Sequence, residues 1–162
     1  MKIFYIILLS ALYSCISVNS IRENYSLIPI HEQEILINTS NLPLINYEGP
    51  KMNKKAAEKL DFKVVIENVK TKLNKLGANI YTNENSKQSH IVEISEFNMT
   101  VNFHSITAKV KMNIRRLSDN YTYQVMGTYY KGGMGSETKI FEKAITVALM
   151  EFYQMDYKKQ IE

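Results

Sequence analysis

The chain has 162 residues, of which 45% are hydrophobic and 22% are charged, and its formal net charge is +4. These values are typical of one globular domain with short appendages, and they exclude a wholly disordered chain. The net charge is also too small for a dedicated nucleic-acid-binding protein, so we expect no nucleic-acid partner.

The N-terminus has the pattern of an export signal. Lys2 precedes an apolar run from Ile3 to Leu12, which is shorter than the roughly 20 residues that a membrane-spanning helix needs. The sequence Leu12-Tyr13-Ser14-Cys15 resembles the lipobox of bacterial lipoproteins. It predicts a signal peptide of residues 1–14 and lipidation of Cys15. Cleavage after Ser20 is the alternative and gives a signal peptide of residues 1–20.

Cys15 is the sole cysteine of the chain, so no intramolecular disulfide can form. A single cysteine placed where the apolar run ends favours lipidation over removal with the leader. Its neighbour Ile16 is not the aspartate associated with retention in the inner membrane. We therefore expect an exported protein, lipid-anchored to the periplasmic side of the outer membrane, with residues 15–26 as a tether. A secreted, soluble protein that binds a host or polymer surface is the alternative.

Residues 27–156 are expected to form a single α+β domain, followed by a polar tail at residues 157–162. One or two short strands are predicted between Leu27 and Ile37, and another between Leu42 and Tyr47. The first predicted helix begins near Asp61 and ends before Gly77, a typical C-cap residue. Its apolar stripe, at steps of mostly three and four, comprises Phe62, Val65, Ile66, Val69, Leu73 and Leu76. A short strand follows at Ala78–Tyr81.

The region from His90 to Lys131 is predicted to be an antiparallel meander of amphipathic strands. Alternating apolar residues occupy Phe97–Phe103, Ile106–Ile114 and Tyr121–Tyr129, which indicates one dry face and one wet face. Val92 and Ile94 have the opposite parity, and a bulge at Ser95-Glu96 accounts for this change. Asp119-Asn120 fits a hairpin turn.

A second helix is predicted after Ser136, its candidate N-cap residue. Its apolar stripe comprises Phe141, Ala144, Ile145, Ala148, Leu149 and Phe152. The resulting fold class is α+β, an antiparallel β-meander with two helices packed on one face of the sheet, a two-layer sandwich. If the early strand pairs in parallel with Ala78–Tyr81, its crossover is expected to be right-handed.

No catalytic constellation is evident in the sequence. His31, His90 and His104 are scattered and are interpreted as surface residues, so we expect no metal site. The glycine-rich run Gly132–Ser136 lacks the ending of a phosphate loop. We expect no cofactor and no enzymatic activity, and an enzyme that uses paired carboxylates in a cleft is a less favoured alternative.

One candidate binding face remains. Lys109, Lys111 and Arg115, with Arg116 alongside, are predicted on the wet face of the central strand of the meander, and Tyr130 comes from its neighbour. A solvated surface is the plainer interpretation of this basic row. As a binding face, it suits a polyanion or a partner protein, and export argues against single-stranded nucleic acid. We expect an envelope protein as partner, in addition to the membrane that the N-terminal lipid would enter.

The chain resembles small bacterial lipoproteins of the YajG type over roughly residues 27–155. The resemblance lies in the helix ending Leu76-Gly77-Ala78-Asn79-Ile80, the amphipathic strands, the glycine-containing connection and the final helix around Ala144–Leu149. It implies a membrane-tethered, periplasm-facing binding or assembly module.

Overall fold

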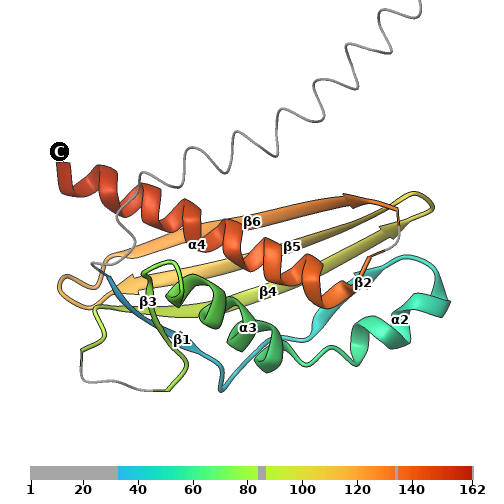
Figure 1. The fold of residues 1–162 in the computed structure, drawn as a ribbon, viewed down its shortest axis with the longest axis horizontal. Coiled ribbons are helices and arrows are strands. Elements are labelled where there is room, and N and C mark those ends of the chain that lie inside the picture. The colour runs from blue at the N-terminus through green and yellow to red at the C-terminus, as the bar shows by residue number, and fades with distance from the viewer. Residues whose placement is uncertain (1–32, 84–86, 134, 162) are drawn as a thin grey trace, which may run out of the picture.

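The computed structural model describes residues 33–83, 87–133 and 135–161. The signal peptide, Cys15 and the tether lie outside the described residues. The elements, in chain order, are β1 (Glu34–Asn38), β2 (Ile45–Glu48), α2 (Lys51–Glu58), α3 (Phe62–Asn74), β3 (Asn79–Tyr81), β4 (His90–Asn102), β5 (Ser105–Arg116), β6 (Thr122–Gly132) and α4 (Glu137–Ile161) (Figure 1).

The strands form one mixed sheet in the order β3-β1-β4-β5-β6, and β2 also pairs with β4. The predicted antiparallel meander is present as β4, β5 and β6. The prediction of an antiparallel sheet is wrong for the remaining strands, because β1 pairs in parallel with β3 and β4, and β2 pairs in parallel with β4. Long connections carry the chain back to the same end of the sheet before these partners begin, which is the requirement for parallel pairing.

The predicted bulge in β4 is confirmed. The pairing of β4 with β5 shifts its register between Ile94 and Glu96. Val92 and Ile94 are buried before the shift, and Phe97 and Met99 are buried after it. The extra residue therefore keeps both halves of this long strand directed toward one core.

Helix α3 begins as its sequence indicates. Asp61 is the N-cap residue, and its carboxylate accepts hydrogen bonds from the backbone N–H groups of Lys63 and Val64. Gly77 follows the helix with φ of +96°. Leu76 was expected in the buried stripe but is 69% exposed, because the helix ends at Asn74. Helix α2 was not predicted, because its segment is rich in lysine and shows no apolar stripe in the sequence; Ala57 is buried there.

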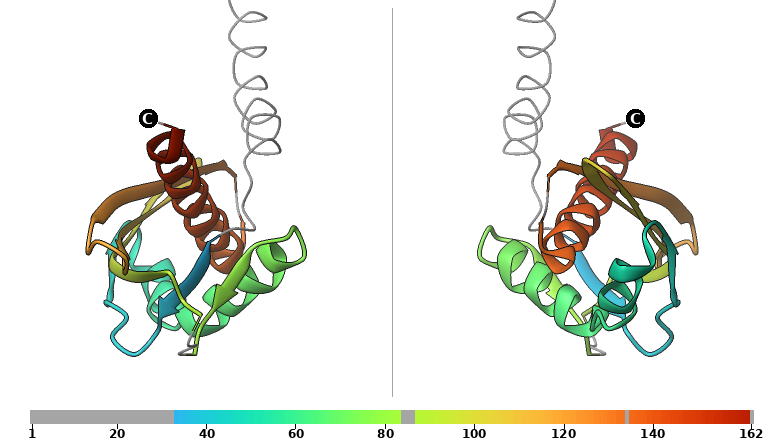
Figure 2. Two further views of the ribbon diagram at one scale, coloured as in Figure 1. Left: turned by 90° about the vertical axis from the view of Figure 1, so that its left-hand side faces the viewer. Right: turned by 90° about the vertical axis from the view of Figure 1, so that its right-hand side faces the viewer.

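Three phenylalanines join the helices to the sheet. The ring of Phe62 on α3 stacks on that of Phe97 on β4, with centroids 3.8 Å apart. Phe141 on α4 packs edge-on against both, at 5.0 and 5.7 Å. Helix α4 also contacts β5 and β6, and the sheet curves partly around it (Figure 2). All three phenylalanines belong to the hydrophobic core.

Two expectations about chain ends and turns are wrong. Phe103 was placed on the apolar face but is 95% exposed, because it lies in the turn between β4 and β5. Helix α4 continues to Ile161, so residues 157–161 are helical where a polar tail was expected. The hairpin turn at Asp119-Asn120 is confirmed, with Asn120 at φ of +57°.

Candidate functional site

The sheet has a polar face opposite its core face. On β5 and β6 this face consists of the residues that alternate with the buried ones. We call it the open face, and on these two strands it comprises Thr107, Lys109, Lys111, Asn113 and Arg115, and Thr122, Gln124, Met126, Thr128 and Tyr130. All ten are exposed or half-buried. Helix α4 contacts β5 and β6, and Phe62 of α3 stacks on Phe97 of β4. The buried residues of both helices and of the strands belong to one hydrophobic core.

The four predicted binding residues lie on the open face. Lys109, Lys111 and Arg115 project from alternate positions of β5, and all are exposed. Tyr130 of β6 lies opposite Thr107, which makes it a diagonal neighbour of Lys109. Arg115 lies about 20 Å from Lys109 along the strand, because each residue advances the chain by about 3.4 Å. The basic row therefore has two separate ends.

The middle of the basic row contains an ion pair. Lys111 Nζ lies 2.5 Å from the Glu96 carboxylate, and Asn98 Nδ2 donates to the other oxygen of Glu96 at 2.5 Å. The hydrogen bond from Lys111 is the main reason that the pKa of Glu96 is lowered. Lys109 lies opposite Asn98 and Thr128, so it is the more available cation at this end of the open face.

Four polar side chains form a straight row across the open face. In the strand registers, Asn38 lies opposite Glu93, Glu93 opposite Asn113, and Asn113 opposite Gln124. We call these four residues the polar row. It crosses β1, β4, β5 and β6 at right angles to the strands.

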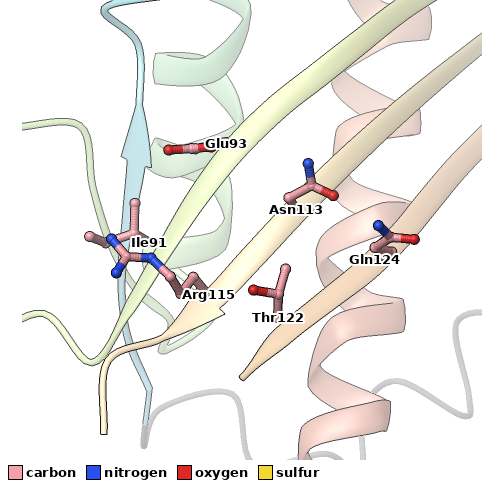
Figure 3. A pocket seen from close by; sticks show the side chains of 6 residues that line it. All are labelled: Ile91, Glu93, Asn113, Arg115, Thr122 and Gln124. Carbon is pink, nitrogen blue, oxygen red and sulfur yellow. The ribbon is translucent and has the colours of Figure 1, made fainter. Parts of the chain in front are cut away.

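Two adjacent shallow hollows follow the polar row. The first, of about 260 Å³, is lined by Ile91, Glu93, Asn113, Arg115, Thr122 and Gln124 (Figure 3). The second, of about 190 Å³, is lined by Asn38, Asn41, Glu93, Ile94, Ser95 and Asn113. Because Glu93 and Asn113 line both, the hollows join into one polar groove. Amide and hydroxyl groups dominate it, with one cation and one carboxylate.

Arg116 does not belong to the open face. It alternates to the core side, where its Nη1 donates to Asp156 Oδ1 at 3.4 Å and its Nε and Nη2 donate to Asp119 at 3.0 and 2.6 Å. The two bonds from Arg116 keep the pKa of Asp119 well below its usual range. The sequence prediction that Arg116 lies beside the exposed basic row is therefore wrong, because strand alternation directs it inward.

A buried polar cluster surrounds Asp156 at the end of the sheet where β6 begins. Asp156 is 1% exposed. It accepts hydrogen bonds from the hydroxyl of Tyr123 at 2.6 Å and from Gln33 Nε2 at 2.9 Å. Burial and the bond to Asp156 raise the pKa of Tyr123. The cluster joins the start of β1, the end of β5, the start of β6 and the last turns of α4.

His90 was interpreted as a surface residue, but it is 4% exposed. Its ring packs edge-on against Phe152 at 5.0 Å, its Nδ1 lies 2.9 Å from Ser89 Oγ, and its Nε2 lies 4.0 Å from Asp156 Oδ1. Burial lowers the pKa of His90, although the nearby Asp156 opposes this shift. The surroundings of His90 therefore disfavour the charged form of its imidazole.

The sequence contains a partial signal for this cluster. Asp156 follows Phe152 and Tyr153 at helical steps of four and three, so it continues an apolar stripe. A carboxylate at such a position predicts a buried partner. The polar row has no comparable signal, because its members come from four strands whose registers a single sequence does not specify.

The described residues contain no group of three or more histidine, cysteine, aspartate or glutamate side chains suited to hold a metal ion. Within residues 33–83, 87–133 and 135–161, no helix combines the length and apolar character needed to cross a bilayer.

Neither a protein-family model nor a curated protein matches the sequence. Among solved structures, the fold is similar to lipoprotein GNA1162 from Neisseria meningitidis, with 9% identity, a TM-score of 0.34, and coverage of 80% of this chain and 97% of that chain. It is also similar to the hypothetical protein CT253 from Chlamydia trachomatis, with 9% identity, a TM-score of 0.36, and coverage of 78% and 95%. TM-scores this low identify no family, and the resemblance to YajG-type lipoproteins stays a prediction.

Proposed function

We propose that this protein is a non-enzymatic lipoprotein of the bacterial envelope, anchored through Cys15, that docks an envelope protein on its open face. The observation that carries the docking role is the contrast between the two faces of the sheet. The residues of one face are buried in the core, while the other face presents cations, amides and the exposed ring of Tyr130. Tyrosine and arginine are enriched in protein interfaces, and the open face has Tyr130 and Arg115.

A binding role is also favoured over catalysis by the composition of the groove. Both hollows are lined by the same single carboxylate, Glu93, and neither is lined by a histidine or a cysteine. General acid-base chemistry on a substrate in the groove would need a second titratable group close to Glu93. Amides and hydroxyls instead recognise a ligand through hydrogen bonds.

The anchoring half of this proposal rests on the lipobox-like sequence, and intact mass spectrometry of the native protein tests it. A chain that begins at acylated Cys15 and sediments with membranes is expected. The Cys15→Ser variant should remain unlipidated and leave the membrane fraction. A native chain that begins at Ile21 would contradict the anchor and favour the secreted, soluble alternative.

Site-specific photo-crosslinking tests the docking half. A photoreactive amino acid is introduced at Lys109 on the open face, and at Lys63 on α3 as a matched exposed control. In cells of the native host, the first position is expected to yield a discrete crosslinked complex that the control position lacks. Identical crosslinking from both positions, or none from Lys109, would contradict docking on the open face.

A further inference from the structure

We propose that the polar row binds a linear glycan that carries carboxylate groups, laid across the four strands in the joined hollows. This inference rests on the proposed function, because it takes the open face to be the binding surface. It adds a glycan ligand to the protein partner already proposed, and places the glycan at the Arg115 end of the open face, away from Lys109 and Tyr130. The polar row comprises Asn38, Glu93, Asn113 and Gln124, and Arg115 lies beside it.

The spacing of the row suits a repeating polymer. Adjacent strands in a sheet lie about 4.8 Å apart, so directly opposed side chains offer a hydrogen-bonding group at each such step. This step is close to the length of one sugar ring in a 1,4-linked chain. A glycan that crosses the strands therefore places successive rings over Gln124, Asn113 and Glu93 in turn.

The side chains of the row match sugar chemistry. Each amide offers both donors and an acceptor, and a carboxylate accepts from two hydroxyls. Thr122 adds a hydroxyl group at the β6 end of the groove. Ile91 is half-buried beneath the groove, so its apolar surface can meet the C–H face of a ring. The groove thus offers polar groups for hydroxyls and an apolar contact for the ring.

The groove contains one cation, Arg115, and one carboxylate, Glu93, so a carboxylate of the glycan is expected over Arg115 while its hydroxyl groups donate to Glu93. Arg115 lies two residues after Asn113 on β5, between Ile91 of β4 and Thr122 of β6. Figure 3 shows its guanidinium beside Ile91. One of its nitrogens donates to Asn120 Oδ1 at 3.3 Å. A guanidinium has five N–H donors, so the others are available to a carboxylate, often in a two-point contact.

The groove is less suited to a peptide strand. Peptides commonly bind sheets by adding a strand to an edge, where unpaired backbone groups form the ladder. Here β1, β4 and β5 are interior strands with neighbours on both sides, and their backbones are already paired. Recognition across them depends on side chains, and a hydroxyl-rich chain provides more partners for amides than an extended peptide does.

Calorimetric titration of the full-length protein in detergent tests the inference. The acidic probe is a hexasaccharide of β-1,4-linked mannuronate, and the neutral probe is hexa-N-acetylchitohexaose, which has the same linkage and the same number of sugar rings. The acidic probe is expected to bind more tightly. Asn113→Ala and Gln124→Ala should each weaken its binding about five- to tenfold, the effect of one or two lost hydrogen bonds. Thr128→Ala, on the same face of β6 but outside the row, should change it less than twofold.

Arg115→Gln separates the role of charge from the role of the row. It is expected to remove the preference for the acidic probe while binding of the neutral probe is retained. Circular dichroism checks that each variant is folded. Because the two amide variants lie on different strands, the inference can still be tested if one of them fails to fold. Absence of acidic-probe binding at millimolar concentration, equal affinity for both probes, or full affinity in both amide variants would overturn the inference. Because crosslinking from Lys109 is measured separately, failure here is distinct from failure of protein docking.

Discussion

Gly127 on β6 lies directly against the backbone of Ala144 on α4. A Cβ atom on Gly127 would lie 1.8 Å from the Ala144 carbonyl oxygen and 2.6 Å from the amide nitrogen of Ala148. Both distances are far inside van der Waals contact, and the atoms concerned belong to the backbone of the helix. The helix thus contacts the sheet at a point where only glycine fits.

Gly127→Ala is expected to lower the free energy of unfolding by about 3 kcal/mol, because α4 must move away from the sheet to admit the methyl group. Guanidinium denaturation followed by circular dichroism measures the change. Gly132→Ala on the same strand is the matched control, since nothing lies within 4 Å of the added atom there. It should alter stability by less than about 0.5 kcal/mol. Equal stability of the two variants would contradict the close contact.

Asp156→Ala is expected to destabilise the protein by about 3 kcal/mol. It leaves the hydroxyl of Tyr123 and the amide of Gln33 without their acceptor and removes a partner of Arg116, and buried groups that lose a charged partner are costly. Asp156→Asn retains an acceptor oxygen for Tyr123 and should cost less. Denaturation curves compare the two variants, and a smaller loss for alanine than for asparagine would count against the cluster.

Stability is expected to fall as the pH is lowered from about 7 toward 5, and His90 is the cause. Burial depresses its pKa in the folded state, while in the unfolded chain the pKa is about 6.5. The unfolded chain therefore binds the proton first, and acid favours unfolding. Asp119 and Glu96, whose pKa values are also lowered, lose their stabilising contribution only below about pH 4.5.

Denaturation at several pH values between 7.5 and 5 checks this assignment. In His90→Gln the fall in stability over this range should largely disappear. The matched control is His104→Gln, because His104 is exposed, and this variant should keep the wild-type dependence. An unchanged pH dependence in His90→Gln would show that another group is responsible.

Glu151→Ala is expected to increase self-association. The backbone N–H of Met126, on the edge strand β6, donates to Glu151 Oε2 at 3.3 Å, and a carboxylate at an edge discourages pairing with a second sheet. Sedimentation velocity at matched concentrations measures the effect. Glu58→Ala, an exposed residue of α2, should sediment as wild type does. A Glu151 variant that also sediments unchanged would remove the protective role of this contact.

Local periodicity was sufficient to predict the meander and the start of α3. The parity change between Ile94 and Phe97 located the bulge, because side chains on a strand alternate strictly. Asp61 and Gly77 act through local hydrogen bonds and backbone conformation, and both lie where capping preferences place them. The ends of elements were less predictable. Leu76 and Phe103 continue an apolar pattern past the point where the helix or strand stops.

Features that depend on distant pairing were not predictable. Parallel pairing of β1 with β4 depends on contacts between segments far apart in the sequence, and nothing local distinguishes it from other arrangements. The same holds for the polar row, whose members Asn38 and Gln124 belong to separate strands. Lys109 and Lys111 were placed on an exposed face correctly because alternation along one strand was enough, whereas the pairing of Lys111 with Glu96 required the register.

The parallel position of β1 has a consequence for the order of folding. Glu34 bonds to Ser89, a residue 55 positions later in the chain, whereas β4, β5 and β6 follow one another directly. Closing the short hairpins costs less entropy than closing the long loop, and contacts between neighbours in sequence form faster. During synthesis β1 emerges first but has no partner until β3 and β4 follow. Strand β1 is therefore synthesised first but is among the last strands to pair. A chaperone that shields β1 until it pairs would improve the yield of folded protein.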